Sequence, residues 1–372
     1  MYLDYAATCP VDKRVLKEML PFFSEKYGNT GSLHSFGQEA KIALEKARER
    51  IADLIFAQTE EIIFTSSATE SNNLILKGLL KKNDHLIISC IEHPCIKETA
   101  KFLKTKGVLV TELKIDKQGF VKDLEKSIKK NTALISIIHA SNEIGVVQDI
   151  EKISKVAKRN KILFHTDAAQ SFGKIPINVK NIDFLTASSH KIYGPKGAAL
   201  LYIKKGLKIN PLLHGGGQEQ GLRSSTVNIP AIVGFGKAAE IAKKEIQEDY
   251  KKQIKLRNKI ITQALKIKAC YLNGDQNKRL ANNINLRFSN IEGEALTMKL
   301  DLEGIAVSTG SACASTKLEP SYVLLALGLK PQEAHGSLRI SLGKYTREQE
   351  IDYFLKILSQ SVKELRKLSP FK

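Results

Sequence analysis

The stretch Ile162–Gln170, with the sequence ILFHTDAAQ, decides the fold. It starts as a short apolar run and ends in the polar residues Asp167 and Gln170. An amphipathic stretch, Ile150–Arg159, comes before it, and a second apolar run, Phe184–Ala187, comes after it. Such alternation of short strands with helices is typical of βα units arranged around a mostly parallel sheet.

The same alternation extends along the chain in both directions. Further strands are predicted at Glu61–Thr65, Leu86–Ser89, Ala133–His139 and Ala198–Ile203, and further helices at Gly37–Leu54, Ser71–Lys82 and Pro94–Thr105. Towards the C-terminus the sequence predicts helices at Ile229–Ile267, Glu294–Leu302 and Arg347–Lys367, and strands at Asn282–Phe288 and Arg339–Leu342. We therefore predict an α/β protein whose large domain, residues 13–248, surrounds a mostly parallel central sheet. Residues 1–12 and 249–372 are predicted to form a smaller α/β C-terminal domain.

The composition is that of an ordinary globular enzyme. Of the 372 residues, 42% are hydrophobic and 26% are charged, and the net charge is +19. Because the basic residues are spread along the chain and Trp is absent, we attribute this charge to solvated lysine and expect no direct binding of nucleic acid. No apolar run approaches the roughly 18 residues of a membrane helix, and no secretory signal is evident. Five irregularly spaced cysteines argue against a disulfide framework, so we expect a cytoplasmic location without membrane contact.

Polar and ionisable residues follow five of the predicted strands. In a parallel α/β sheet, ligands bind at the carboxyl ends of the strands, so these groups are expected to converge on one site. The groups are Ser66–Ser71, Glu92-His93, Ser141–Glu143, Asp167 with Gln170, and Ser188–Lys191.

Three of these groups suit a phosphorylated aldehyde cofactor. Ser66–Ser71 could bind phosphate at a helix N-terminus, although Thr69 or Ser71 could equally be an ordinary helix cap. A carboxylate such as Asp167, at the end of a buried strand, needs a partner, which the ring nitrogen of pyridoxal phosphate (PLP) would supply; an N-cap is the alternative. Lys191, among hydroxyls and glycines, could form an imine with an aldehyde, whereas most lysines lie on the surface.

His93 could stack on such a ring and move protons near neutral pH, or it could be a core or surface histidine. A metal site built from His93 with Cys90 and Cys95 is not expected, because the spacing matches no common zinc pattern.

Two residues outside the predicted large domain are also candidates for the functional site. Cys313 lies in the small, polar stretch Ser308–Thr316, where a thiol could collect a group and carry it, whereas a structural cysteine normally has apolar neighbours. The other four cysteines are interpreted as structural. Arg339, inside an apolar strand, suits bidentate binding of a carboxylate, with an internal ion pair as the alternative.

Motifs along almost the whole chain resemble those of the cysteine desulfurases of the NifS/IscS type. These are PLP-dependent transferases of fold type I, in the class-V aminotransferase family. The motifs are Tyr2–Thr8, Gly28-Asn29, His34–Gly37, Thr65–Asn72, Glu92-His93, Ser141–Gly145, His165–Gln170, Ser188–Gly197, Gly215–Thr226, Ser308–Ser315 and Ser337–Lys344.

The resemblance implies roles for the residues around the cofactor. Lys191 would hold PLP through an imine, Asp167 would pair with the ring nitrogen, and Gln170 would hydrogen-bond the phenolic oxygen. His93 would stack on the ring and act as acid and base. The remaining cofactor-binding residues implied by position are Ala68, Thr69, Asn142, Ser188, His190 and, from the neighbouring subunit of a homodimer, Thr226.

The resemblance also implies the reaction. Asn142 and Arg339 would contact the substrate L-cysteine, with Arg339 on its carboxylate. Lys191 would remove the α-proton, and Cys313 as a thiolate would attack the substrate sulfur, leaving a persulfide on Cys313 and releasing L-alanine. The sulfur would then pass to an acceptor such as an iron–sulfur scaffold or a tRNA-thiolating enzyme.

Two other classes of function remain open from the sequence. A selenocysteine lyase or a small-substrate transaminase would use the same cofactor; rates on selenocysteine test the first, and a dispensable Cys313 would indicate the second. A non-catalytic sulfur carrier or RNA-binding protein with this fold is supported only by the charge of +19.

Overall fold

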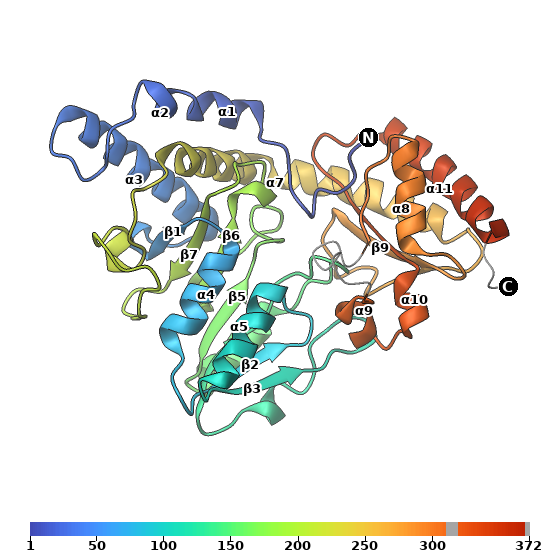
Figure 1. Cartoon of the computed structure of the whole chain (residues 1–372), viewed down its shortest axis with the longest axis horizontal. Coiled ribbons are helices and arrows are strands. Elements are labelled where there is room, and N and C mark those ends of the chain that lie inside the picture. Colours follow the sequence, from blue (N-terminus) through green and yellow to red (C-terminus); the bar gives the residue numbers. More distant parts are fainter. Residues whose placement is uncertain (310–318, 369–372) are drawn as a thin grey trace.

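We describe the protein from a computed structural model, in which residues 1–309 and 319–368 are placed (Figure 1). Within these residues, seven strands form a central sheet. They are, in spatial order, β1 (Ile62–Thr65), β7 (Ala199–Ile203), β6 (Phe184–Ser188), β5 (Leu163–Asp167), β4 (Thr132–Ser136), β2 (His85–Ser89) and β3 (Leu109–Leu113). Neighbouring strands are parallel except where β7 pairs with β1 and β6, so the predicted mostly parallel α/β sheet is confirmed.

The edge strand β3 was not predicted. Its sequence, LVTEL, includes the polar residues Thr111 and Glu112 and is partly exposed, and it pairs with β2 alone, so it lacks the long apolar run that marks the interior strands.

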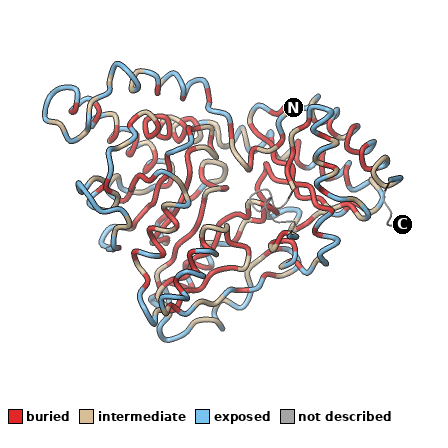
Figure 2. Tube along the Cα trace, viewed as in Figure 1, coloured by how far each residue is buried: buried red, intermediate tan, exposed pale blue. Residues whose placement is uncertain are grey.

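Helices cover both faces of the central sheet. Successive strand residues point to opposite faces, so Phe64 and Ile63 belong to different apolar clusters. The face of Phe64 is covered by α3 (Ser35–Ile55), α6 (Ile150–Arg159) and α7 (Ile229–Ala264), and the face of Ile63 by α4 (Ala68–Leu79) and α5 (Pro94–Thr105). Figure 2 shows the strands between these layers as almost continuously buried.

A second, antiparallel sheet has the order β10 (Ser337–Ser341), β9 (Asn283–Phe288), β8 (Cys270–Leu272). Its apolar cluster includes residues of α8 (Gly293–Leu302), of α11 (Glu348–Leu368) and of the C-terminal part of α7. Leu3 of the N-terminal arm joins this cluster, and its N–H donates to the carbonyl of Ala306 at 2.8 Å. Since α7 runs without a break through residue 248 (Figure 1), the domain limits 13–248 and 1–12 with 249–372 remain a proposal.

Four short α-helices complete the α-helices and strands of the described residues: α1 (Lys13–Met19), α2 (Pro21–Ser24), α9 (Tyr322–Ala326) and α10 (Pro331–His335). Of these, α9 packs in a separate apolar cluster in which Val323 and Leu324 meet Ile91, Ile138 and Ile144 from the loops of the central sheet. Among the described residues, no helix is both long and apolar enough to cross a membrane.

Candidate active site

A pocket of about 510 Å³ opens at the carboxyl ends of the parallel strands. Apart from Thr226 and Cys313, every predicted site residue lines it. These residues are Ala68, Thr69, His93, Asn142, Asp167, Gln170, Ser188, His190, Lys191 and Arg339. Thr226 lines a neighbouring hollow that shares Ser66 and Gly197 with this pocket. Cys313 lies outside the described residues.

Lys191 lies in a short 3-10 turn that directly follows β6. Its ammonium group donates to the carbonyls of Ala6 and Ala7, at 2.7 Å each, and the Gln170 amide donates to the Ala6 carbonyl at 2.9 Å. The N-terminal arm is therefore part of the pocket wall. Sequence reasoning placed the arm in a motif but assigned its residues no role.

Asp167 ends β5 and is buried. Its Oδ2 accepts a hydrogen bond of 2.8 Å from Nδ2 of Asn72, and its Oδ1 accepts one of 2.9 Å from the N–H of Ala169. These two donors fix the plane of the carboxylate. Asn72 lies in the motif Thr65–Asn72, yet sequence reasoning missed its role, because only the packing of α4 on the sheet brings it to β5.

His93 is the N-cap of α5, and its Nδ1 accepts a hydrogen bond from the N–H of Cys95 at 3.3 Å. When the ring is neutral, its proton is consequently on Nε2. Burial lowers the pKa of His93, and the nearby Lys191 lowers it further, while Asp167 opposes both. His93 is therefore neutral at physiological pH and able to exchange a proton.

Cys95 was interpreted as structural, but it lines the pocket. Its Sγ lies 3.0 Å from Nδ1 of His93 and 3.2 Å from Nδ2 of Asn72. Burial raises the pKa of this thiol to about 12, so it is a neutral neighbour of His93 and a poor nucleophile. In the sequence, the position of Cys95 two residues after His93 was the signal that could have placed it in the pocket.

The N-terminus of α4 faces the pocket. The helix starts at Ala68 because Ser67, not Thr69 or Ser71, is its N-cap: Oγ of Ser67 accepts the N–H of Glu70 at 3.1 Å. Ser71 instead hydrogen-bonds Thr65 and the carbonyl of Leu200 inside the fold.

Several donors therefore stand together at this end of the pocket. Uncapped N–H groups of the first turn of α4 lie in the same wall as Ser188 and Lys196. Burial lowers the pKa of His190 to about 4, with Lys191 next in effect, so its imidazole is neutral. This set suits a phosphate group.

Arg339 and Asn142 form the opposite wall. Nη2 of Arg339 donates to Asp4 at 2.8 Å and Nη1 to the carbonyl of Asn142 at 3.2 Å. The internal ion pair considered from the sequence thus exists. Nε of Arg339 and Oδ1 of Asn142 are nevertheless buried without a hydrogen-bond partner among the placed residues. An unpaired donor and an unpaired acceptor in one pocket wall suit a ligand that carries both a carboxylate and an amine.

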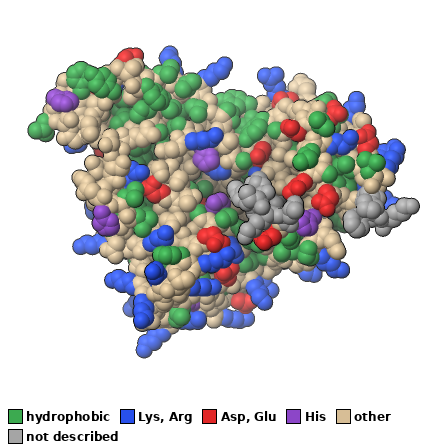
Figure 3. Space-filling model, viewed as in Figure 1, with side chains coloured by type: hydrophobic (Ala, Val, Ile, Leu, Met, Phe, Trp, Pro, Cys, Tyr) green, Lys and Arg blue, Asp and Glu red, His purple; other side chains and the backbone are tan. Residues whose placement is uncertain are grey.

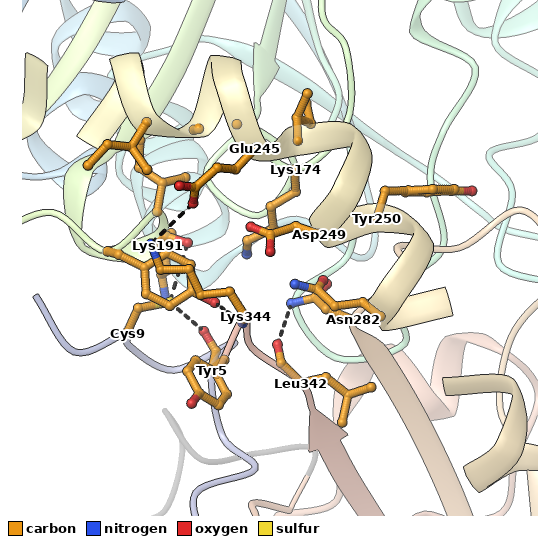
Figure 4. Close-up of a pocket in the computed structure, with 17 residues that line it drawn as sticks. Tyr5, Cys9, Lys174, Lys191, Glu245, Asp249, Tyr250, Asn282, Leu342 and Lys344 are labelled. Carbon is orange, nitrogen blue, oxygen red and sulfur yellow. Dashed lines mark hydrogen bonds and ion pairs between the residues drawn. The ribbon is translucent and has the colours of Figure 1, made fainter. Parts of the chain in front are cut away.

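A second, smaller cavity of about 30 Å³ is also lined by Lys191 (Figure 4). Figure 4 shows Cys9, Lys174 and Asp249 around it. The ammonium group of Lys174 is buried, and within the described part of the chain it has no hydrogen-bond partner. Burial lowers its pKa.

The family model for class-V aminotransferases matches residues 1–354. The chain belongs to the class-V aminotransferase family. Among the curated relatives of this chain, cysteine desulfurase IscS of Dictyoglomus turgidum is 48% identical over 100% of this chain and 97% of its own length.

Solved structures agree with this assignment. A "NifS-like protein" has a TM-score of 0.92 at 42% identity, covering 98% of this chain and 100% of its own. The structure described as SspA in complex with cysteine has a TM-score of 0.83 at 40% identity, covering 93% and 99%. The predicted family and the fold of fold-type I PLP enzymes are confirmed.

The residues of this class-V aminotransferase fit PLP, the cofactor of the family. An ammonium group, a buried carboxylate at a strand end and a helix N-terminus line one pocket, as an aldehyde, a ring nitrogen and a phosphate require. Among the placed residues, Oδ1 of Asn142 and Nε of Arg339 have no hydrogen-bond partner, so both atoms can bind an amino acid in the pocket.

Proposed function

We propose that the protein is a PLP-dependent cysteine desulfurase, which releases L-alanine from L-cysteine and holds the sulfur as a persulfide on Cys313. One observation carries this proposal. The N–H of Arg339 donates to the carbonyl of Ser308 at 2.7 Å, and the N–H of Ser308 donates back at 3.2 Å. Ser308, five residues before Cys313 in the sequence, therefore lies beside the arginine that suits the substrate carboxylate.

In this proposal the other residues that line the pocket have the following roles. Lys191 would hold the cofactor and would take the α-proton of the substrate on its amine. Asp167 would keep the ring nitrogen protonated, and Gln170 would hydrogen-bond the phenolic oxygen. His93 would lie against the ring and exchange a proton through Nε2. The phosphate would be bound by Ala68, Thr69, Ser188 and His190.

Bound PLP draws electrons from the amino acid attached to it and so stabilises negative charge on the substrate. Arg339 binds the carboxylate and, with Asn142, orients the substrate. The thiolate of Cys313 forms an S–S bond with the cysteine sulfur while the C–S bond breaks. The bonding electrons stay with the carbon skeleton, which takes up a proton and leaves as alanine, so no external oxidant or reductant is consumed.

The test compares purified wild type with Lys191→Ala and Cys313→Ala. Wild type should absorb in the visible when loaded with PLP and convert cysteine to alanine, with sulfide released by a reductant. Lys191→Ala should lose the stable cofactor absorbance, whereas Cys313→Ala should keep it and form no persulfide. Persulfide formation by Cys313→Ala would show that the sulfur nucleophile is another residue.

We also propose that the enzyme is a homodimer, with Thr226 reaching the phosphate of the partner subunit. Thr226 lines its own hollow next to the pocket. Figure 3 shows hydrophobic side chains gathered over α1 to α3, where large apolar residues are exposed. They include Leu16, Leu20, Phe23, Tyr27, Leu33, Phe36 and Ile42. A monomer by analytical ultracentrifugation, with full activity, would contradict this arrangement.

The sulfur acceptor is proposed to be an iron–sulfur scaffold or a tRNA-thiolating enzyme in the cytoplasm. In Figure 3 the basic side chains are distributed widely over the visible face, which supports solvated lysine in place of a nucleic-acid platform. A pull-down after loading the Cys313 persulfide should recover the acceptor, and unloaded enzyme is the control.

A further inference from the structure

The chain that follows the Cys313 segment is held against the walls of the pocket. Ser321 is the N-cap of α9, and its Oγ accepts the N–H of Leu324 at 3.2 Å. The same hydroxyl donates to Oε2 of Glu143 at 2.5 Å. Glu143 directly follows Asn142, which lines the pocket. The first turn of α9 is therefore bonded to the loop that carries a proposed substrate-binding residue.

Both groups of this hydrogen bond are buried. Glu143 is 4% and Ser321 is 6% exposed. Removing either side chain therefore leaves the other polar group buried without a hydrogen-bond partner, because water does not reach it. Such a buried bond between residues 178 positions apart holds two segments at a fixed separation.

A second contact fixes α9 to the neighbouring loop. The hydroxyl of Tyr322 donates to the carbonyl of Glu92 at 2.6 Å, and Glu92 directly precedes His93. The apolar side chains of α9 pack against Ile91 and Ile144, which flank these same two loops. On the C-terminal side of Cys313 in the sequence, α9 is thus attached to the loops of His93 and Asn142. On the N-terminal side, Ser308 is attached to Arg339.

We propose that Glu143 and Ser321 are positioning residues for sulfur transfer, whose hydrogen bond holds the start of α9, eight residues after Cys313 in the sequence, against the loop of Asn142. The inference rests on the proposed desulfurase function. The two residues act through this bond and touch neither the cofactor nor the reacting sulfur. Their role concerns the delivery of the thiolate, so cofactor binding and cysteine binding do not depend on them.

The experiment separates these steps in the PLP-loaded, full-length enzyme. Cysteine is added without reductant, and the persulfide on Cys313 is followed by the mass increase of the protein together with the first equivalent of alanine. Ser321→Ala and Glu143→Leu break the bond from opposite sides. Each should slow persulfide formation at least tenfold. The visible absorbance of the cofactor, and the cysteine concentration that half-changes this absorbance, should stay within threefold of wild type.

Conservative variants provide the rescue. Ser321→Thr keeps a hydroxyl, and Glu143→Gln keeps an acceptor, so both should form persulfide within threefold of the wild-type rate. Ser154→Ala removes a buried hydroxyl from α6, far along the chain from both residues, and should have no effect. The double variant of Ser321→Ala with Glu143→Leu should form persulfide no more slowly than the slower single variant, because both substitutions remove the same hydrogen bond between the two side chains.

The inference is wrong if the broken-bond variants form persulfide at the wild-type rate. It is also wrong if cysteine binding weakens as much as persulfide formation, since the pair would then support the pocket in general. If one variant fails to fold, the other removes the same bond and decides. A wild-type enzyme that releases no alanine would instead contradict the proposed function itself.

Discussion

Nδ2 of Asn72 donates a hydrogen bond of 2.8 Å to Oδ2 of Asp167, and both side chains are buried. This bond joins α4, whose N-terminus faces the pocket, to the end of β5. The helix that suits the phosphate and the carboxylate that suits the ring nitrogen are thereby held in one unit. The contact between Asn72 and Asp167 thus sets the spacing between the helix N-terminus and the carboxylate.

Replacing Asn72 with Leu should weaken PLP binding about tenfold, because the loss of one buried hydrogen bond to a charged group costs about 1.5 kcal/mol. A titration of the apoenzyme with PLP, followed by visible absorbance, measures this. Asn160→Leu, at the end of α6, is the control and should leave PLP affinity unchanged. Equal PLP affinity of Asn72→Leu and wild type would show that the hydrogen bond from α4 to Asp167 does not contribute to PLP binding.

Arg339→Lys should raise the KM for cysteine at least tenfold and leave the cofactor absorbance unchanged. Lysine can keep an ion pair with Asp4, but it lacks the second arm that a carboxylate can bind. Steady-state kinetics measure the effect. Arg287→Lys, on the adjacent strand β9, removes an arginine that lies over the ring of Tyr271 and should leave KM as it is. An unchanged KM in Arg339→Lys would remove Arg339 from the substrate site.

The contribution that two buried carboxyl groups make to the stability of the fold should fall as the pH rises from 5 to 8. Burial raises the pKa of Glu92 to about 8 and that of Glu143 to about 7, from 4.5 in both cases. The folded protein therefore keeps protons that the unfolded chain releases, so this contribution is full below pH 4.5 and is lost as the pH rises through 7 and 8. Each group contributes a slope of about 1.4 kcal/mol per pH unit between its two pKa values.

Glu92→Gln should remove the Glu92 part of this contribution, because an amide cannot ionise, so the free energy of unfolding of the variant should increase relative to that of wild type as the pH rises from 5 to 8. Urea unfolding of the PLP-loaded enzyme at several pH values gives the free energy of unfolding. Glu151→Gln, which changes an exposed residue of α6, is the matched control and should keep the wild-type slope. A Glu92→Gln slope equal to that of wild type would mean that Glu92 is already ionised in the folded protein.

Lys174→Met should stabilise the protein at neutral pH by about 1–3 kcal/mol. A buried ammonium without a hydrogen-bond partner among the placed residues is costly, and methionine has a similar length without the charge. Thermal and urea unfolding measure the difference. Lys126→Met, at an exposed position, should change stability little. Destabilisation by Lys174→Met would indicate that the ammonium is hydrated in the small cavity beside Asp249.

Most strands of the central sheet were predictable because their residues carry local information. The run Phe184–Ala187 is apolar except for Thr186, as suits a strand buried on both faces, and the structure extends it only to Ser188. The edge strand Leu109–Leu113 escaped prediction because one side of it faces solvent. The start of α4 was placed at Ser71 because several hydroxyl residues in a row can cap a helix, and only backbone geometry selects Ser67.

The sequence by itself determined the family, the mostly parallel sheet and the convergence of Lys191, Asp167 and His93 on one edge, since strand ends and motif spacing are properties of the chain alone. Only the tertiary structure decided the partners of these groups. Asn72 reaches Asp167, Cys95 reaches His93, and Ser321 reaches Glu143 through helix packing on loops from distant parts of the chain. Such contacts depend on how whole elements pack, and no local pattern of residues encodes that packing.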